Sequence, residues 1–357
     1  LFYKSFPLHV AMLRGTTADE NGNISFEHES IISEAMAVAQ AAKKNGGIVI
    51  VQVEYITKNG TMQPKDVKIP GIMVDYVVQA TDQRACWQAE GVYYEPAFSG
   101  QVKKPLSAII PLSLDERKVI ARRCAMELKK GAVVNLGVGM AVDVANVVSE
   151  EGYVDKIVLT TESGAIGGVP SSLPNFGSAY NPEAAIDHGA MFDFIDGGGL
   201  DMTCLGLGEA DKEGNVNVSK FGARLTGPGG FINITQSTKK VVFCGTFMGK
   251  AKLAVGDGRI TVVQEGKIKK FLNHVEQITF SGKYAHAGQE IIYVTERCVF
   301  RLINGRMTIT EIAPGIDLEK DILANMNFQP DISNDLQLMD RRLFCKTWGG
   351  LGEVFVV

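Results

Sequence analysis

An internal repeat constrains the fold of this chain more than any other feature. Residues 18–24, Ala-Asp-Glu-Asn-Gly-Asn-Ile, reappear at 210–216 as Ala-Asp-Lys-Glu-Gly-Asn-Val. Downstream of each copy, a pair of lysines precedes an apolar segment, at 43–51 and again at 239–244. Because both sequence features recur in the same order, duplication of a structural unit is favoured over an isolated glycine turn. We therefore predict two copies of one α/β unit.

Length and charge bound the class of protein. The 357 residues, 45% hydrophobic and 21% charged, suffice for one large domain with additions or for two domains of about 150 residues. A net charge of −4 gives no positive field for nucleic acid or an anionic membrane, and no apolar run reaches the roughly 18 to 20 residues of a membrane span. We expect a soluble, cytoplasmic protein that binds neither nucleic acid nor membrane.

Cysteine and histidine residues give no sign of a metal site. The six cysteines are scattered without a C-x-x-C pair, and the five histidines add no zinc-binding spacing. We expect reduced, mostly buried thiols and no bound metal.

A linker divides the chain in our prediction. Residues 95–112 carry three prolines in a polar setting, which is typical of a linker. We predict a first domain at 1–105, including the linker, and a second domain at 112–357. The chain begins without methionine inside an apolar stretch, so we expect the first domain to lack its beginning.

The pattern of the second domain predicts an α/β fold with a mainly parallel, mixed sheet. Strand, helix and strand follow one another with short connections, which is the order of a parallel βαβ unit, whereas Asn304-Gly305 is the strongest short signal for an antiparallel hairpin. A capping box at 113–116 marks a helix start. The expected elements are a helix whose apolar stripe runs over 119–128, a strand at 132–136, a helix at 140–149, a strand at 156–161, hairpin strands at 299–303 and 306–310, and a helix at 318–326.

Ligands of open parallel sheets bind at the carboxyl ends of the strands, so the residues that follow each strand carry the chemistry. The first such place contains Gly137 and Gly139, a G-x-G turn that allows close approach of a ligand to the backbone. The third glycine of the G-x-G-x-x-G dinucleotide motif is missing, because Val142 stands at that position and Asp143 follows it, so that motif is absent. A simple tight turn is the alternative.

The second place contains Glu162, directly after an apolar strand and before Gly164, Gly167 and Gly168. A glutamate is ionised at pH 7 without a partner base and can attack an acyl carbon. We therefore regard Glu162 as a candidate nucleophile, with a capping role at a loop as the alternative. The G-x-S-x-G motif is absent, and His188 belongs to no such motif.

The third place is the glycine-rich bend at 227–235. Backbone N–H groups of Gly229 and Gly230 are candidates for stabilising an oxyanion, which is worth about 2.7 to 4 kcal/mol per good donor. A plain glycine turn is the alternative.

Taken together, these motifs resemble the family I coenzyme A transferases, and most closely their propionate and acetate CoA-transferase branch. The resemblance covers nearly the whole chain. It implies two similar open α/β domains, the first of them incomplete in this chain, in agreement with the repeat. The segments that carry it are 161–170 (Thr-Glu-Ser-Gly-Ala-Ile-Gly-Gly-Val-Pro), 135–139, 196–201, 229–236, 277–280, 295–300 and 311–317.

The resemblance implies transfer of CoA between a short-chain acyl-CoA and a free carboxylate such as acetate, propionate or butyrate. Catalysis would be ping-pong through a glutamyl-CoA thioester on Glu162, with CoA as substrate and no permanent cofactor. Gly230 and Gly229 would hold the oxyanion, and a homo-oligomer, dimer or tetramer, would be formed. The residues implied in CoA binding are Asn135, Gly137, Gly139, Gly164, Gly167 and Gly168.

Some features of the family find no counterpart in this sequence. The family's N-terminal segment helps to bind CoA and supplies a side-chain donor to the oxyanion hole, and no residue here is assigned to either role. Relatives often have asparagine where Asp201 stands, and an ionised carboxylate repels an oxyanion, so Asp201 is not assigned to the hole. Alternative functions are an acyl-CoA hydrolase, a sugar-phosphate isomerase of related fold and a non-catalytic CoA-binding protein.

Overall fold

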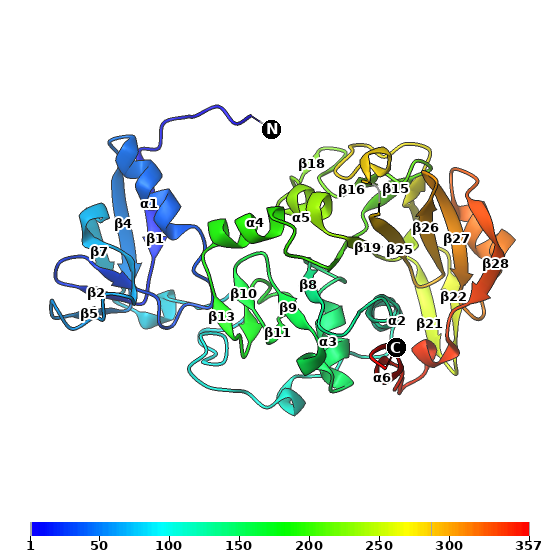
Figure 1. Ribbon diagram of the computed structural model, residues 1–357, viewed down its shortest axis with the longest axis horizontal. Helices are drawn as coiled ribbons and strands as arrows, with labels where there is room; N and C mark the ends of the chain where they lie inside the picture. The colour runs from blue at the N-terminus through cyan, green and yellow to red at the C-terminus, as the bar shows by residue number, and fades with distance from the viewer. Residues whose placement is uncertain (1, 287, 357) are drawn as a thin grey trace. The chain divides into compact units, whose positions relative to one another are not determined.

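The computed structural model describes residues 2–286 and 288–356, and the chain forms two compact units (Figure 1). Unit 1 comprises Leu1–Lys104 and Thr161–Phe192, and unit 2 comprises Pro105–Thr160 and Asp193–Val357. Each unit is therefore built from two separate segments of the chain. The domain boundaries predicted from the sequence, 1–105 and 112–357, differ from the boundaries of these compact units and stay a prediction.

A three-stranded parallel sheet in the order β1-β4-β7 forms the centre of unit 1. The helix α1 packs on it through Ala35, Ala39 and Ala42, whose spacing places them on one face of the helix (Figure 1). Val49 and Val51 point to the same core because alternate residues of a strand share a face. These elements are β1 (Val10–Arg14), α1 (Ala35–Lys44), β4 (Ile48–Val53) and β7 (Tyr76–Gln79).

The remaining strands of unit 1 are short. Four of them form a sheet in the order β5-β2-β3-β6, and the antiparallel pairs β10–β13 and β11–β12 follow later in the chain. Their bounds are β2 (Thr17–Asp19), β3 (Ile24–Ser25), β5 (Tyr55–Thr57), β6 (Val67–Ile69), β10 (Ala165–Ile166), β11 (Val169–Pro170), β12 (Ala179–Tyr180) and β13 (Ala184–Ala185).

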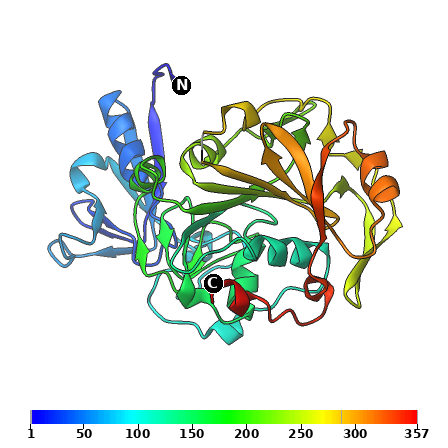
Figure 2. The ribbon, with the colours of Figure 1, turned by 45° about the vertical axis from the view of Figure 1, so that its right-hand side comes forward.

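Unit 2 is built on a larger mixed sheet (Figure 2). Its strands β9-β8-β14-β19-β25 are parallel, β26 and β27 continue the sheet in antiparallel fashion, and β28 runs parallel to β27. The α/β class with mainly parallel strands is therefore confirmed. The strands are β8 (Val133–Leu136), β9 (Val158–Thr160), β14 (Met202–Gly206), β19 (Lys240–Cys244), β25 (Glu290–Val294), β26 (Cys298–Ile303), β27 (Arg306–Ile312) and β28 (Asp331–Leu338).

Helices and smaller strands complete unit 2. The α-helices of this part are α2 (Glu116–Ala125), α3 (Asp143–Glu150), α4 (His188–Asp196, which begins in unit 1), α5 (Phe231–Ser237) and α6 (Leu351–Val354). The smaller strands are β15 (Glu209–Asp211), β16 (Val216–Asn217), β17 (Lys220–Phe221), β18 (Arg224–Leu225), β20 (Met248–Gly249), β21 (Lys252–Gly256), β22 (Arg259–Gln264), β23 (Ile268–Lys269) and β24 (Phe271–Leu272).

The predicted hairpin is confirmed, whereas two helix predictions need correction. Ile303 lies opposite Arg306 across the Asn304-Gly305 turn, and both turn residues have positive φ, as this type of turn requires. The helix predicted at 318–326 is instead a π-helical turn, Leu318–Ile322, followed by a 3₁₀ turn, Leu323–Asn325.

The cap of α2 also differs from the predicted capping box. Asp115, and not Ser113, is the N-cap residue, and its carboxylate accepts a hydrogen bond from the Lys118 N–H at 3.0 Å. A carboxylate caps a helix as well as a hydroxyl does and also interacts favourably with the helix dipole, so the helix starts at Glu116.

The internal repeat is confirmed in the backbone and in the side chains. We call residues 10–79 copy 1 and residues 202–294 copy 2. In copy 1 the Asp19 carboxylate accepts hydrogen bonds from the backbone and the side chain of Asn23, whose Oδ1 in turn accepts from Gly71 N–H. Asp211, Asn215 and Gly282 make the same three hydrogen bonds in copy 2.

The central strands of the two copies also pair in the same register. Val10 lies opposite Ile48 in copy 1, and Met202 lies opposite Lys240 in copy 2, with the same spacing along the chain. Each copy thus contains two parallel strands joined through a glycine-asparagine turn and a helix.

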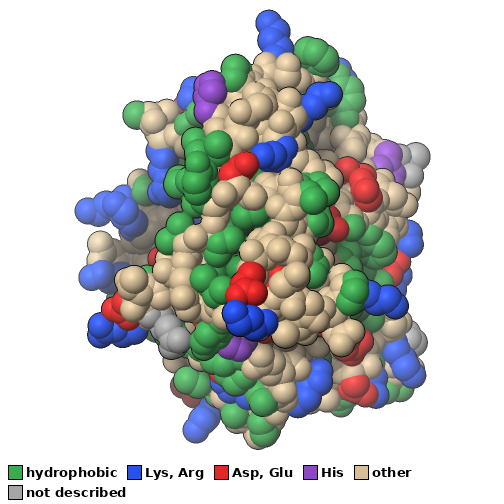
Figure 3. All heavy atoms as spheres, turned by 90° about the vertical axis from the view of Figure 1, so that its left-hand side faces the viewer, with side chains coloured by type: hydrophobic (Ala, Val, Ile, Leu, Met, Phe, Trp, Pro, Cys, Tyr) green, Lys and Arg blue, Asp and Glu red, His purple; other side chains and the backbone are tan. Residues whose placement is uncertain are grey.

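The two copies differ in how their sheets are covered. Met12 and Tyr76 point to the sheet face of copy 1 that does not face α1, and they are 83% and 59% exposed. The strands of copy 2 are almost entirely buried. Figure 3 shows hydrophobic side chains gathered in patches among charged ones on one face of the protein. Within residues 2–286 and 288–356, no helix has the length and apolarity to cross a bilayer.

Candidate active site

Glu162 lies in a tight turn directly after β9, and hydroxyl groups fix both of its neighbours. The Ser163 hydroxyl donates to the Gly177 carbonyl at 2.6 Å, and the hydroxyls of Thr161 and Ser163 are 2.9 Å apart. Thr161 Oγ1 also accepts from the Ala165 N–H at 3.2 Å. Because the residues on either side are anchored, the backbone that carries Glu162 has a defined conformation.

The Glu162 carboxylate itself has no hydrogen bond or ion pair within the described part of the chain, although its side chain is partly buried. Burial raises the pKa of Glu162, and the charge of His188 lowers it in opposition. A carboxylate that has lost water without gaining hydrogen bonds is a stronger nucleophile than a solvated one. The turn therefore presents a carboxylate without a partner in the described residues, which suits the predicted role of Glu162 as a nucleophile.

The glycines after Glu162 are required by the backbone. Gly164, Gly167 and Gly168 all have positive φ. A Cβ atom on Gly164 would lie 2.0 Å from the Ile186 carbonyl oxygen, and one on Gly168 would lie 2.1 Å from that of Tyr180. These contacts explain the glycines through close packing of the β10–β13 segment. Their role in an acyl pocket or in CoA binding stays a prediction.

Gly229 and Gly230 form a turn at the start of α5 whose amides are available for an anion. Gly229 has a φ of 53° and Gly230 a φ of −76°. Successive residues of left-handed and right-handed conformation direct adjacent N–H groups into one concavity, an arrangement that binds anions. Within the described residues, neither N–H donates a hydrogen bond to the protein. The geometry suits the predicted oxyanion role.

The residues predicted along the pantetheine route lie at the carboxyl end of β8. Asn135 is 1% exposed, and its Nδ2 has no hydrogen-bond partner in the described residues. A Cβ atom on Gly137 would lie 2.8 Å from the Leu205 side chain, while the space around Gly139 is open. The strand thus brings Asn135, Gly137 and Gly139 together, and their contact with CoA stays a prediction.

The predicted residues fall into separate groups. Glu162 and the three glycines that follow it belong to unit 1, whereas the Gly229-Gly230 turn and the end of β8 belong to unit 2. The pairing of Glu162 with the glycine amides therefore stays a prediction.

Asp201 has a structural role at the opposite edge of the unit 2 sheet. Its carboxylate accepts from the Val133 N–H at 3.0 Å and from Lys239 Nζ at 2.7 Å, at the amino ends of β8 and β19. The Lys239 hydrogen bond lowers the pKa of Asp201, so the group is ionised. This arrangement agrees with leaving Asp201 out of the oxyanion hole.

Unit 1 also contains a side-chain contact, between His188 and Glu34, that no sequence motif predicts. His188 begins α4, and its Nδ1 lies 3.0 Å from Glu34 Oε2. The sequence holds no signal for this pair, because Glu34 and His188 are far apart along the chain and belong to no common motif.

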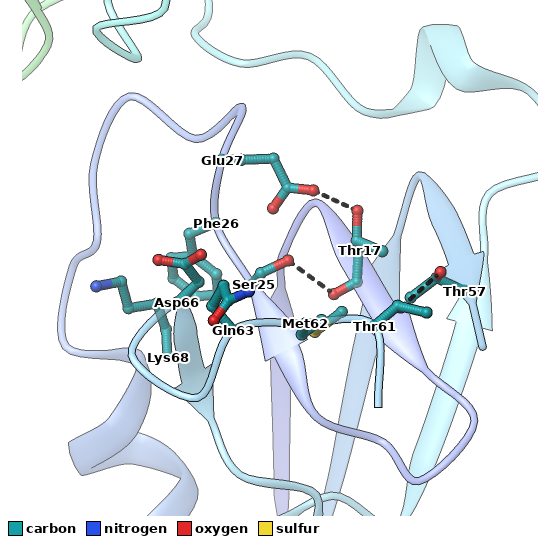
Figure 4. Close-up of a pocket in the computed structure, with 10 residues that line it drawn as sticks. All are labelled: Thr17, Ser25, Phe26, Glu27, Thr57, Thr61, Met62, Gln63, Asp66 and Lys68. Atoms are coloured by element: carbon teal, nitrogen blue, oxygen red, sulfur yellow. Dashed lines mark hydrogen bonds between the residues drawn. The ribbon is translucent and has the colours of Figure 1, made fainter. Parts of the chain in front are cut away.

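A cavity of about 570 Å³ lies in unit 1, and none of the predicted site residues lines it (Figure 4). Its wall includes the Phe26 ring and the Lys68 and Asp66 side chains (Figure 4). In the described part of the chain, no cluster of three or more histidine, cysteine, aspartate or glutamate side chains could hold a metal ion.

The comparisons define the class of protein. A family model described as "Coenzyme A transferase" matches residues 2–80. The chain is 66% identical over 360 residues to a relative of which it covers 69%, and this similarity extends over 99% of the chain. The chain therefore belongs to the coenzyme A transferase family, and within it to family I.

That relative is the caffeate CoA-transferase of Acetobacterium woodii. The acetate CoA-transferase YdiF of Escherichia coli O157:H7 is 44% identical over 96% of this chain, which spans 65% of the relative. The crystal structure of the YdiF apoenzyme superposes with a TM-score of 0.89 over 98% of this chain and 65% of that one. A second YdiF structure, a thioester complex with CoA, gives a TM-score of 0.88 over 98% of this chain and 65% of that one.

Proposed function

We propose that this chain transfers CoA between an acyl-CoA and a free carboxylic acid through a covalent glutamyl-CoA thioester on Glu162. One observation carries the proposal: an anchored, partly buried carboxylate without a hydrogen bond or ion pair, at the carboxyl end of a parallel strand. Membership of the CoA-transferase family supports this reaction over the sugar-phosphate isomerase alternative.

The first half-reaction starts at a Glu162 oxygen. This oxygen attacks the thioester carbonyl of acyl-CoA, the carbon–sulfur bond breaks, and an acyl-glutamyl anhydride and CoA thiolate result. The thiolate then attacks the glutamyl carbonyl carbon, which releases the first carboxylate and leaves CoA on Glu162. A second carboxylate reverses these steps. Glutamate suits this role because it needs no base to become a nucleophile.

The glycine amides would act on the tetrahedral intermediates. In each addition step the carbonyl oxygen becomes negatively charged, and the free N–H groups of Gly229 and Gly230 would donate to it. Contacts to the distant parts of CoA would supply binding energy for the strained anhydride step.

Two classes of acid are candidates for the exchange. The sequence motifs favour short-chain acids such as acetate, propionate and butyrate. The 66% identity to a caffeate CoA-transferase favours an aromatic propenoic acid, since this relative is more similar than the acetate CoA-transferase. An exchange assay of acyl-CoA against labelled acetate, propionate, butyrate and caffeate separates the two classes.

The covalent step is tested by mass spectrometry on the complete polypeptide. Incubation with acyl-CoA and no acceptor acid is expected to add CoA to the peptide that contains Glu162, and Glu162→Gln is expected to abolish both the adduct and the exchange. The exposed Glu90 offers a matched control, and Glu90→Gln is expected to keep both. Transferase activity in Glu162→Gln would refute the assignment. If the parent hydrolyses acyl-CoA to free acid and CoA without exchange with an added carboxylate, the hydrolase alternative would be selected.

A further inference from the structure

Two hydroxyl groups and one backbone carbonyl enclose the turn that carries Glu162. Thr161 Oγ1 lies 3.3 Å from the Gly177 carbonyl oxygen and 2.9 Å from Ser163 Oγ, and the Ser163 hydroxyl donates to the same carbonyl at 2.6 Å. The Gly177 oxygen is thus within hydrogen-bond distance of the residues on both sides of Glu162. We call the hydroxyls of Thr161 and Ser163 together with the Gly177 carbonyl the clamp.

The backbone of this turn depends on the Thr161 side chain. The Thr161 N–H donates to the Ala165 carbonyl at 3.0 Å, and the Gly164 N–H donates to the Thr161 carbonyl at 3.2 Å. The Ala165 N–H, however, donates to Thr161 Oγ1 at 3.2 Å. Thr161 is 1% exposed, so solvent does not replace this hydroxyl group when it is removed. Loss of the hydroxyl therefore loosens the turn.

The Gly177 carbonyl is itself held in place by its neighbours. Gly177 has a φ of 98°, and a Cβ atom at this position would lie 3.0 Å from the Ile31 side chain. The hydroxyl of the adjacent Ser178 donates to Ser30 Oγ at 2.9 Å. These residues, like Glu162, belong to unit 1. The clamp thus connects the turn of Glu162 to a fixed part of the same unit.

We propose that Thr161 and Ser163 are positioning residues, which set the place of the Glu162 carboxylate through their contacts with the Gly177 carbonyl. This inference rests on the proposed function of Glu162 and adds the groups that orient it. In that function Glu162 reacts twice, first through an oxygen and then through its own carbonyl carbon, and each step needs reacting atoms about 3 to 3.5 Å apart. Within the described residues no hydrogen bond to the carboxylate fixes its position, so the turn has to do so.

Unit 1 contains a matched threonine outside this turn. Thr16 is fully buried, and its Oγ1 accepts a hydrogen bond from the His28 N–H at 2.9 Å. Thr16→Val and Thr161→Val therefore each remove one buried hydroxyl group and leave one backbone N–H without its acceptor. The two variants share a structural cost, but only Thr161→Val changes the turn that carries Glu162.

The test is the rate of adduct formation on Glu162, measured by mass spectrometry in single turnover with the complete polypeptide. In Thr161→Val we expect this rate to fall about 10- to 100-fold, because a displacement of about 1 Å can cost about 10²-fold. The concentration of acyl-CoA that gives half the maximal rate should stay the same, since positioning acts on the chemical step. Thr161→Ser keeps the hydroxyl group and should restore most of the rate, and Thr16→Val should leave the rate unchanged.

A double variant tests whether the two hydroxyl groups act as one unit. Ser163→Ala should lower the rate less than Thr161→Val, because Thr161 keeps its contacts with Gly177 and Ala165. The double variant should be little slower than Thr161→Val alone, since residues that share one partner are not additive. If the two effects multiply, the hydroxyl groups act independently and the clamp is refuted.

The results distinguish this inference from the proposed function. If the parent forms the adduct and both threonine variants form it equally fast, the inference is wrong and the function of Glu162 stands. If the parent forms no adduct at Glu162, the proposed function fails, and hydrogen–deuterium exchange decides on the clamp. The amides of Gly164 and Ala165 should then exchange faster in Thr161→Val than in the parent or in Thr16→Val, and unchanged exchange would contradict the inference.

Discussion

The two copies of the repeat share a backbone but differ at the entrance to their helix. In copy 1 the two residues before α1 are Ser33 and Glu34, and in copy 2 the two residues before α5 are Gly229 and Gly230. Ser33 and Gly229 have almost the same positive φ, 58° and 53°. The same turn thus carries a carboxylate that binds His188 in one copy and two free backbone amides in the other.

This difference shows how a duplicated turn acquires two kinds of chemistry. The left-handed residue is a property of the shared backbone, because even a serine adopts it in copy 1. The residue that follows decides what the turn offers: a charged side chain at Glu34, or an uncovered N–H group at Gly230.

The largest effect is expected from removing one amide in copy 2. Gly230→Pro deletes the N–H at a φ of −76°, which proline adopts. We expect kcat to fall about 10²- to 10³-fold, the usual cost of one oxyanion donor. Gly230→Ala keeps the N–H and is the control. Steady-state kinetics with circular dichroism as a check on folding measures the effect, and equal activity of the two variants would show that the amide has no catalytic role.

The next effect concerns the glycine-asparagine turns. Asp211→Ala should lower the free energy of unfolding by about 3 kcal/mol and Asp19→Ala by about 2 kcal/mol, because both leave buried donors unpaired. The larger cost in copy 2 follows from an additional hydrogen bond, from Val275 N–H to Asp211 at 3.3 Å. Urea denaturation measures both. A greater cost for Asp19→Ala would contradict the comparison, and the exposed Asp66→Ala should change stability by less than about 0.5 kcal/mol.

A smaller, pH-dependent effect is expected at Glu162. Its pKa is raised in the folded state above the ordinary value of 4.5, so its contribution to stability is complete below that value and is lost as the pH rises through the folded pKa. Glu162→Gln removes this loss. The variant should match the parent at pH 4 and be more stable by up to about 1 kcal/mol at pH 8. Thermal unfolding across this range measures the difference, and a constant difference would show that Glu162 does not titrate in this way.

The smallest effect is expected at Ser33. Replacing a left-handed serine by glycine relieves about 1 kcal/mol of strain and costs a similar amount of chain entropy, so Ser33→Gly should change stability by less than about 0.5 kcal/mol. Gly229→Ala, in contrast, introduces this strain although no atom lies within 4 Å of the new Cβ. Its unfolding free energy should fall by about 1 kcal/mol. A larger cost for Ser33→Gly than for Gly229→Ala would show that the two turns are not equivalent.

Local features could be predicted from the sequence where residues close together in the chain determine them. The Asn304-Gly305 hairpin and the two glycine-asparagine turns form hydrogen bonds between near neighbours, so their residue types suffice to predict them. The cap of α2 shows the limit, since Ser113 and Asp115 are both good caps and the fold selected Asp115.

The candidate site could be predicted only in part for the same reason. Glu162 was found because it follows a strand and precedes glycines. The contact between Glu34 and His188 in unit 1 was not predicted, because it joins distant segments of the chain and no motif connects the two residues.

The amino-acid sequence by itself determined the repeat, the parallel α/β class and the turn that carries Glu162, because apolar periodicity and turn residues act over short stretches of chain. Tertiary structure decided which charges surround that turn and which faces of equally apolar strands are covered: the strands of copy 2 are buried, whereas Met12 and Tyr76 of copy 1 are exposed. Burial and electrostatic potential are sums over neighbours from distant segments, and only the folded chain brings those neighbours together.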